Sequence, residues 1–405
     1  MTTAVRTLLA LFLLCIACSS MCAAPAYDIG VRLDPATREL SGTATIVVPP
    51  GGAAKLMLAQ RFKVARMTLD GAAIAAPLHT HGLSTWTIPA AARERKLAVR
   101  WSGQLAALDQ ALDHRQTLEA DAPVAGNEGS FLPASAAWYP RLDGLMDGYR
   151  IAIDVPAAQR ALVPGRLVDE QQDGGRYRAR FEFPHPAEGI DLMAGPYRID
   201  ARTIEVDGRP IALRTYFHSQ IAELSAGYLD SVKKYIERYS RSIGPYPYSE
   251  FSVVSSPTPT GFGMPTLTYL GIDVLRLPFI RATSLGHEVL HNWWGNGVYP
   301  DYAHGNWSEG LTTFMADYAY KEDDGADAAR AMRLEWLRDF AAVPPGQDRP
   351  LAEFTSRTHG TSQIVGYGKA AMVFLMLRDL IGADAFDAGI RRFWRDRQFK
   401  LASWA

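Results

Sequence analysis

Two histidines and a glutamate within five residues are the part of this sequence best suited to chemistry. His287, Glu288 and His291 form the pattern His-Glu-x-x-His inside the stretch 286–294. In an α-helix, residues four apart leave the same face one turn apart, so both imidazoles can reach one metal ion. Glu288 points away from the centre of this pair and can take a proton from a water molecule. The spacing predicts a zinc site with a general base beside it.

The same residues have a purely structural interpretation. They could form an amphipathic core helix whose two histidines are hydrogen-bonded. Burying two imidazoles and a carboxylate beside Trp293 and Trp294 is unfavourable, however, unless a partner compensates for the lost hydration. A divalent cation is such a partner, and we therefore favour the metal site.

A third protein ligand is required, because catalytic zinc keeps three protein ligands and one open position. Downstream, the segment 306–318 begins with cap-type residues and then becomes apolar at helical spacing, which predicts a helix. Glu309 would lie in the first turn of this helix and face the first one. We expect Glu309 to be the third ligand of one Zn²⁺ per chain.

These residues resemble the M1 family of zinc metallopeptidases, the gluzincins that include the membrane alanyl aminopeptidases and leukotriene A4 hydrolase. The resemblance rests on the runs 287–296 and 307–310. In that family, eighteen residues usually separate the second histidine from the glutamate ligand, whereas seventeen separate His291 from Glu309 here. The connecting loop can absorb a difference of one residue. The resemblance implies a zinc-dependent peptidase with a thermolysin-like catalytic domain.

Just before the metal-binding pattern, residues 261–266 read GFGMPT. In the M1 family this place holds a Gly-x-Met-Glu-Asn strand, whose backbone binds the substrate and whose glutamate grips the free α-amino group. The resemblance implies that Gly263 and Met264 bind substrate. Pro265 stands at the glutamate position, so the charge that selects a free amino terminus is missing there. An edge strand at this place would still let Gly263 pair with an extended peptide.

Two further residues are predicted to act at the site. The segment 365–373 resembles the Tyr-Glu-Lys-Gly segment of the family, with Tyr367 at the tyrosine and Gly368 in place of the glutamate. The resemblance implies that the Tyr367 hydroxyl donates a hydrogen bond to the developing oxyanion, a role that suits a neutral phenol. Glu128 begins a stretch rich in aromatic residues that could form a loop over the site. Glu128 is a hypothetical substrate contact, and the alternative for this stretch is aromatic packing between domains.

The predicted fold class is α+β, with an antiparallel β-domain followed by a mostly helical domain. Apolar and polar residues alternate in segments that we expect to be strands: 27–33, 41–48, 96–101, 148–155 and 176–183. Beyond about residue 200 the period changes, and we expect a strand at 251–255 and helices at 220–243, 284–294, 308–321, 326–340, 368–380 and 383–394. The resemblance implies that residues 27–200 form a β-saddle and residues 201–405 the catalytic domain. M1 enzymes usually continue into a further helical domain, which we expect to be absent or truncated here.

Residues 1–26 have the pattern of a secretory signal, with an apolar run followed by small residues. Cleavage before Tyr27 is favoured over a retained membrane anchor or a lipoprotein signal ending at Cys18. All three cysteines of the chain fall in this segment, so a cleaved chain would contain no disulfide. We expect an exported protein, periplasmic or extracellular, with no integral membrane span after cleavage.

Composition narrows the choice of partner. The chain has 42 basic and 43 acidic residues without charged blocks, which argues against a nucleic-acid or anionic-lipid partner. The predicted partner is a peptide substrate, and the predicted function is zinc-dependent peptide hydrolysis of the M1 aminopeptidase type. Two alternatives remain: an M1-like hydrolase with altered, non-aminopeptidase or endopeptidase specificity because of Pro265, and a non-catalytic peptide-binding module.

Overall fold

The fold is known from a computed structural model that describes residues 25–111, 116, 122–355 and 361–404. Nearly all of the predicted signal segment, residues 1–26, lies outside the described residues. Within the described ranges, no helix combines the length and apolar character needed to cross a bilayer.

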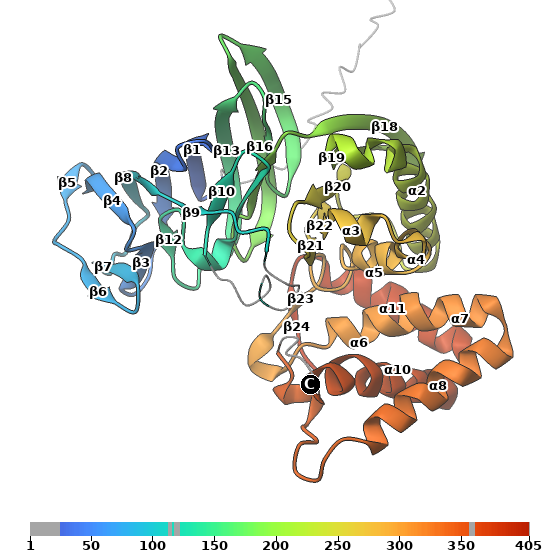
Figure 1. The fold of residues 1–405 in the computed structure, drawn as a ribbon. Helices are drawn as coiled ribbons and strands as arrows, with labels where there is room; N and C mark the ends of the chain where they lie inside the picture. Colours follow the sequence, from blue (N-terminus) through green and yellow to red (C-terminus); the bar gives the residue numbers. More distant parts are fainter. Residues whose placement is uncertain (1–24, 112–115, 117–121, 356–360, 405) are drawn as a thin grey trace, which may run out of the picture.

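The first half of the chain is built around an eight-stranded sheet (Figure 1). Its strands lie in the order β15-β16-β13-β1-β2-β8-β4-β5, with β1 and β13 parallel and the other neighbours antiparallel. Their bounds are β1 (Tyr27–Asp34), β2 (Glu39–Val48), β4 (Phe62–Leu69), β5 (Ala72–Ala73), β8 (Arg95–Gln104), β13 (Asp147–Pro156), β15 (Arg166–Asp173) and β16 (Arg176–Ala187). In β2, Leu40 and Ala44 are buried whereas Ser41 and Thr43 are exposed. One face of the sheet therefore covers the core and the other faces solvent.

Two smaller sheets complete the first half of the chain. Their strand orders are β14-β17-β11-β10-β9 and β12-β3-β7-β6. The bounds are β3 (Ala54–Ala59), β6 (Leu78–Thr80), β7 (Leu83–Ile88), β9 (Ala106–Ala107), β10 (Val124–Gly126), β11 (Gly129–Leu132), η1 (Ala134–Ala136), β12 (Arg141–Leu142), β14 (Arg160–Leu162) and β17 (Leu192–Gly195).

A five-stranded sheet opens the second half, and helices follow it. The strand order is β18-β19-β20-β22-β21, so β21 is an edge strand. Its strands are β18 (Arg198–Val206), β19 (Arg209–Phe217), β20 (Glu250–Ser256), β21 (Gly261–Met264) and β22 (Leu267–Gly271), while β23 (Tyr299–Pro300) and β24 (Leu401–Ala402) pair in a separate two-stranded sheet. The helices are η2 (Ser219–Leu224), α2 (Ser225–Ser242), α3 (Ile272–Leu275), α4 (Pro278–Ala282), α5 (Ser284–Leu290), η3 (Tyr302–His304), α6 (Ser308–Thr313), η4 (Phe314–Tyr318), α7 (Ala319–Asp324), α8 (Ala326–Ala341), η5 (Leu351–Glu353), α9 (Thr361–Gln363), η6 (Ile364–Lys369), α10 (Ala370–Ile381) and α11 (Ala383–Arg397). The α+β prediction is confirmed.

Helix α5, which carries the histidines, is shorter than its apolar pattern predicts. It ends at Leu290 rather than Trp294. The N–H of Trp293 bonds to the carbonyl of Leu290 at 2.9 Å, a tighter 3₁₀-type turn, and Gly295 then takes a φ of +110°. The chain thus leaves the helix immediately after His291.

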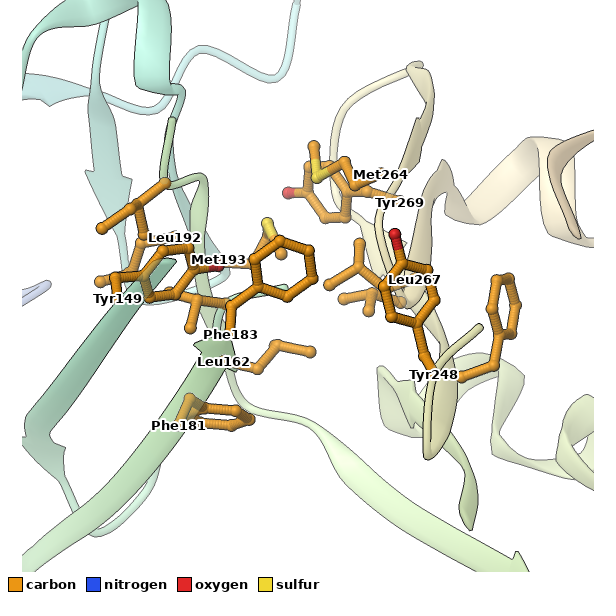
Figure 2. Close-up of a cluster of buried hydrophobic side chains, with 14 of the residues drawn as sticks. Tyr149, Leu162, Phe181, Phe183, Leu192, Met193, Tyr248, Met264, Leu267 and Tyr269 are labelled. Carbon is orange, nitrogen blue, oxygen red and sulfur yellow. The ribbon is translucent and has the colours of Figure 1, made fainter. Parts of the chain in front are cut away.

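The two halves of the chain share one continuous apolar core (Figure 2). Phe183 of β16 packs against Tyr248, with ring centroids 5.7 Å apart. The N–H of Gly165, just before β15, donates a hydrogen bond of 2.7 Å to Oγ1 of Thr266, just before β22. Figure 2 shows Leu162, Phe183 and Met193 facing Tyr248, Leu267 and Tyr269. These contacts hold the first half against strands β21 and β22.

His185, near the end of β16, is expected to make stability depend on pH. Its ring stacks on Phe399 with centroids 3.6 Å apart, and burial lowers its pKa from 6.5 to about 4. Because the folded pKa lies below the unfolded one, the unfolded chain binds the proton first, and stability is lost as pH falls from about 6.5 toward 4.

We therefore expect the thermal unfolding midpoint to fall on acidification through this window. The fall should be smaller in His185→Phe, which retains a stacked ring but cannot be protonated. Differential scanning calorimetry across the window compares the two proteins. Equal falls in both proteins would show that protonation of His185 does not cause the pH dependence of the unfolding midpoint.

Candidate metal centre

His287, His291 and Glu309 converge on one point between α5 and α6. The Nε2 atoms of the two histidines lie 3.1 Å apart, and Oε2 of Glu309 lies 3.5 Å and 3.3 Å from those of His287 and His291. A tetrahedral ion with bonds of about 2.0–2.1 Å requires ligand atoms about 3.3 Å apart. The triangle therefore has the size that one zinc ion needs.

Each histidine ring makes a hydrogen bond through Nδ1, and this bond orients the ring so that the lone pair of Nε2 faces this point. Nδ1 of His291 donates to the carbonyl oxygen of Trp294 at 2.9 Å, and Nδ1 of His287 donates to Oδ2 of Asp317 at 2.7 Å. In the neutral rings Nε2 then carries the lone pair. Oε2 of Glu309 is buried and accepts no hydrogen bond within the described part of the chain. Three electron-rich atoms facing one another repel unless a cation lies between them, so these residues fit a zinc ion.

The charges around the triangle also favour a cation. Burial raises the pKa of Glu288. For Glu309, burial acts in the same direction, but the imidazoles of His291 and His287 outweigh it and hold the pKa well below its usual range. Burial lowers the pKa of His287, yet Asp317 and Glu309 raise it overall. Three carboxylates therefore surround two imidazoles, an arrangement that stabilises positive charge at its centre.

Two π-helical turns flank α5, and each brings a side chain to His287. Asp317 lies on η4, and Tyr367 lies on η6, where its ring stacks on that of His287 with centroids 6.3 Å apart and an interplanar angle of 16°. A π-helical turn rotates the side chains that follow it around the helix axis and is frequent at functional sites. A Cβ atom at Gly366 would lie 2.2 Å from the ring of Phe354, so glycine is required beside Tyr367.

Edge strand β21 brings its backbone against the predicted general base. A Cβ atom at Gly263 would lie 2.3 Å from Oε2 of Glu288, so any larger residue there would displace the Glu288 carboxylate. The neighbouring Met264 is buried, and Figure 2 shows its side chain in the cluster between the two halves. Met264 can therefore reach a peptide only through its backbone.

Pro265 lies in the turn that follows β21, and its apolar ring offers no group that could bind a substrate amine. Pro265 and Thr266 are the central residues of this turn, and Thr266 has a φ of +65°, as the third residue of a type II turn requires. That conformation is strained for a β-branched residue. The N–H of Thr266 donates to Oδ1 of Asn292 at 2.9 Å, and Asn292 directly follows a predicted ligand. The turn is therefore tied to the segment that directly follows α5 and the predicted ligand His291.

Glu128 lies on the turn between β10 and β11, in the first half of the chain. Its backbone carbonyl accepts a hydrogen bond of 2.6 Å from Nε2 of His218, while its side chain is exposed. Phe131 on the same hairpin stacks on Phe262 of β21, with centroids 5.6 Å apart. The hairpin thus lies beside the edge strand. Its aromatic residues pack there, which agrees with the alternative interpretation of this stretch. In the described chain, no hydrogen bond or ion pair joins the Glu128 carboxylate to the predicted metal ligands.

Three residues of the site were missed by sequence reasoning. Asp317 lies eight residues after Glu309, about two turns along the same helical stretch. A carboxylate at that spacing is a signal for a partner that orients a ligand histidine. Asn292 offers a weaker signal, an amide next to a ligand in a buried segment. His218, which follows β19 and holds the Glu128 hairpin, has no local signal.

Replacing Asp317 with asparagine is expected to weaken zinc binding about 10- to 100-fold, because a neutral amide orients the His287 ring less strongly. Competition with a chromophoric chelator measures the zinc dissociation constant. Asp327→Asn, at an exposed position in the first turn of α8, is the matched control. Equal effects of the two substitutions would contradict the orienting role of Asp317.

Among curated proteins, this chain is similar to aminopeptidase N of Haemophilus influenzae, with 24% identity over 264 residues, covering 59% of this chain and 30% of that protein. It is 27% identical over 241 residues to aminopeptidase N of Caulobacter vibrioides, covering 54% and 27%. It is 27% identical over 179 residues to leukotriene A-4 hydrolase of Xenopus laevis, covering 41% and 28%. The similarity therefore spans less than a third of each of these relatives. No protein-family profile matches the sequence.

Among solved structures, the chain is similar to an M1 zinc metallopeptidase from Deinococcus radiodurans, with a TM-score of 0.73 and 21% identity over 93% of this chain and 87% of that one. A variant described as a two-domain M1 zinc metallopeptidase bound to L-arginine gives a TM-score of 0.73 with 20% identity, again over 93% and 87%. The fold is thus that of these metallopeptidases.

Proposed function

On the premise that this chain is similar to the M1 zinc metallopeptidases in fold and in sequence, we propose that it is a zinc-dependent peptidase. The observation that carries the proposal is the triangle formed by His287, His291 and Glu309, with the carboxylate of Glu288 buried beside it. A module that only binds peptides has no need for a buried base next to a complete ligand set. The non-catalytic alternative is therefore disfavoured.

Each of the chain's own groups has a defined part in the proposed reaction. When bound, a zinc ion polarises water and the substrate carbonyl. Glu288, whose pKa is raised by burial, takes the proton of the attacking water and later delivers it to the departing nitrogen. Tyr367 donates a hydrogen bond to the oxyanion. The backbone of Gly263 and Met264 on the edge strand pairs with an extended substrate.

We propose aminopeptidase activity as the first candidate for specificity. The curated relatives from Haemophilus and Caulobacter are named aminopeptidases, and a variant of the Deinococcus enzyme is described as bound to a Tyr-Ser-Ala substrate. The second candidate is a peptidase that does not require a free amino terminus. Pro265 favours this second candidate, because the turn that it occupies has no charged side chain to bind a free amino terminus.

Two fluorogenic substrates separate these candidates. An aminoacyl fluorophore reports release of an amino-terminal residue, and an amino-blocked, internally quenched peptide reports cleavage within a chain. Turnover of the first alone identifies an aminopeptidase, and turnover of the second identifies the altered specificity. If Glu128 contacts the free amine, Glu128→Gln will raise KM for the first substrate and leave kcat little changed. Absence of turnover with both substrates in zinc-loaded protein would contradict the peptidase proposal.

We also propose that the chain is exported and binds one zinc ion. The pattern of residues 1–26 supports export. The stoichiometry is supported by the one triangle of ligand atoms found among the described residues. Fractionation of producing cells tests the location, and metal analysis of the purified chain tests the zinc content.

A further inference from the structure

The exposed face of the eight-stranded sheet forms a hollow, far in sequence from the predicted metal ligands, with a volume of about 780 Å³. Strand pairing aligns residues on neighbouring strands directly opposite one another, and we call one such row across this face, from β16 to β4, a rung. The rung reads Arg180, Ala152, Gly30, Thr43, Arg100 and Arg66. Small residues thus form its middle and arginines stand at both ends. The hollow is a trough with a shallow floor and cationic rims.

A neighbouring rung on the same face repeats this arrangement. From β16 to β4 it reads Arg178, Asp154, Arg32, Ser41, Ser102 and Lys63. Arg32 stands in the middle of the floor, and cations again stand at both ends. The two rungs hold six cationic side chains and one carboxylate, although the whole chain has a net charge of −1. The charged residues that line the hollow itself are Arg32, Arg100, Arg178, Arg180, Asp154 and Asp169.

A β-bulge places one of these arginines on the trough face. The pairing of β4 with β8 shifts between Val64 and Arg66, so Ala65 is the extra residue and Arg66 lies directly opposite Arg100. Bulges of this kind re-aim side chains. Ala65 lines the hollow, and Arg66, opposite Arg100, stands just beyond the lining residues at its end. The fold therefore brings two guanidinium groups together on adjacent strands.

Like charges directly opposite each other on neighbouring strands destabilise a sheet. Arg178 and Arg180 are paired with Asp154 and Asp169 at 3.5 Å and 3.3 Å. No ion pair is found for Arg32, Arg66 or Arg100 in the described ranges, and all three are exposed. An anion bound in the trough would relieve the repulsion between Arg66 and Arg100.

The shape and lining of the trough indicate which anion fits. Neither rung contains an aromatic residue, and Trp101, which lines the hollow, is only 1% exposed, so its ring is not open for a base or a sugar to stack on. A hollow also does not match a planar bilayer. Guanidinium groups bind carboxylates with two parallel hydrogen bonds. Arg180 and Arg100 are four strands apart, a span of about 19 Å at about 4.8 Å per strand, which about six extended residues would cover. We infer that the trough binds an extended acidic polypeptide segment through Arg32, Arg66 and Arg100.

Fluorescence anisotropy of a fluorescein-labelled oligoglutamate peptide, added to the full zinc-loaded chain at low salt, tests this inference. We expect saturable binding that weakens as salt increases. The triple variant Arg32→Gln, Arg66→Gln and Arg100→Gln should bind roughly tenfold more weakly, as expected when three exposed ion pairs are lost. An oligoglutamine peptide of the same length should not bind.

The matched control removes three exposed arginines elsewhere, with Arg198→Gln, Arg330→Gln and Arg397→Gln. It changes the net charge equally and should bind oligoglutamate as the unmodified chain does. The inference is overturned if oligoglutamate does not bind, if the control weakens binding as much as the trough variant, or if a single-stranded RNA oligonucleotide binds more tightly through the same arginines. Circular dichroism of both variants verifies folding, and singly substituted Arg100→Gln provides the readout if the triple variant is unfolded.

Discussion

A Glu288→Gln variant is expected to hydrolyse peptide substrates about 10²- to 10⁴-fold more slowly than the unmodified chain while still binding zinc. Glutamine keeps the size of the buried side chain, but its amide cannot accept and return a proton near neutral pH. Because Glu288 is not one of the three ligand residues, the triangle of ligand atoms should stay intact. The expected change is therefore a loss of kcat with little change in zinc content.

Glu335→Gln is the matched control for this prediction, because Glu335 is exposed on α8. It should leave kcat and KM unchanged. Steady-state kinetics and metal analysis of both variants give the comparison. Full activity in Glu288→Gln would show that another group serves as the base, and loss of zinc from this variant would show that Glu288 helps to hold the metal.

A Glu309→Ala variant is expected to lose zinc affinity by at least about 100-fold, which is more than the loss of an orienting partner causes. The substitution removes one corner of the triangle and leaves two imidazole nitrogens 3.1 Å apart. Two neutral ligands hold a divalent ion less strongly than two ligands and a carboxylate. Activity should fall in step with zinc occupancy and recover partly when excess zinc is added.

His291→Ala should behave in the same way as Glu309→Ala. His304→Ala is the control, since His304 is exposed between the two segments that carry the predicted ligands and pairs with Asp301 at 2.8 Å. Equilibrium dialysis against a zinc buffer measures occupancy. If Glu309→Ala binds zinc as tightly as the His304→Ala control, then Glu309 is not a ligand.

Elements with a regular apolar period could be predicted from the sequence, and irregular ones could not. Strands such as β2 and β16 alternate cleanly, and their cores lie where the alternation predicts. The two-residue strands β9 and β12 carry no period and exist because longer neighbours offer them hydrogen-bond partners. The π-turns η4 and η6 interrupt helices whose apolar spacing is continuous, so the pattern alone cannot place the extra residue.

The predicted site depended on short spacings, and its missing parts depend on contacts between distant segments. The positions of His287 and His291 follow from four-residue spacing on one helix. Asp317 lies on the π-helical stretch η4 and meets His287 across 30 residues of sequence. Thr266 is paired with Asn292 across 26 residues of sequence, a contact that no local pattern reveals.

Anomalous X-ray diffraction at the zinc edge, from crystals of the zinc-loaded chain, tests the central claim most directly. We expect a single strong peak about 2.0–2.1 Å from Nε2 of His287 and of His291, and about 2.0–2.2 Å from a carboxylate oxygen of Glu309. A peak held by only two of these residues, or a zinc ion bound elsewhere with this triangle left empty, would contradict it.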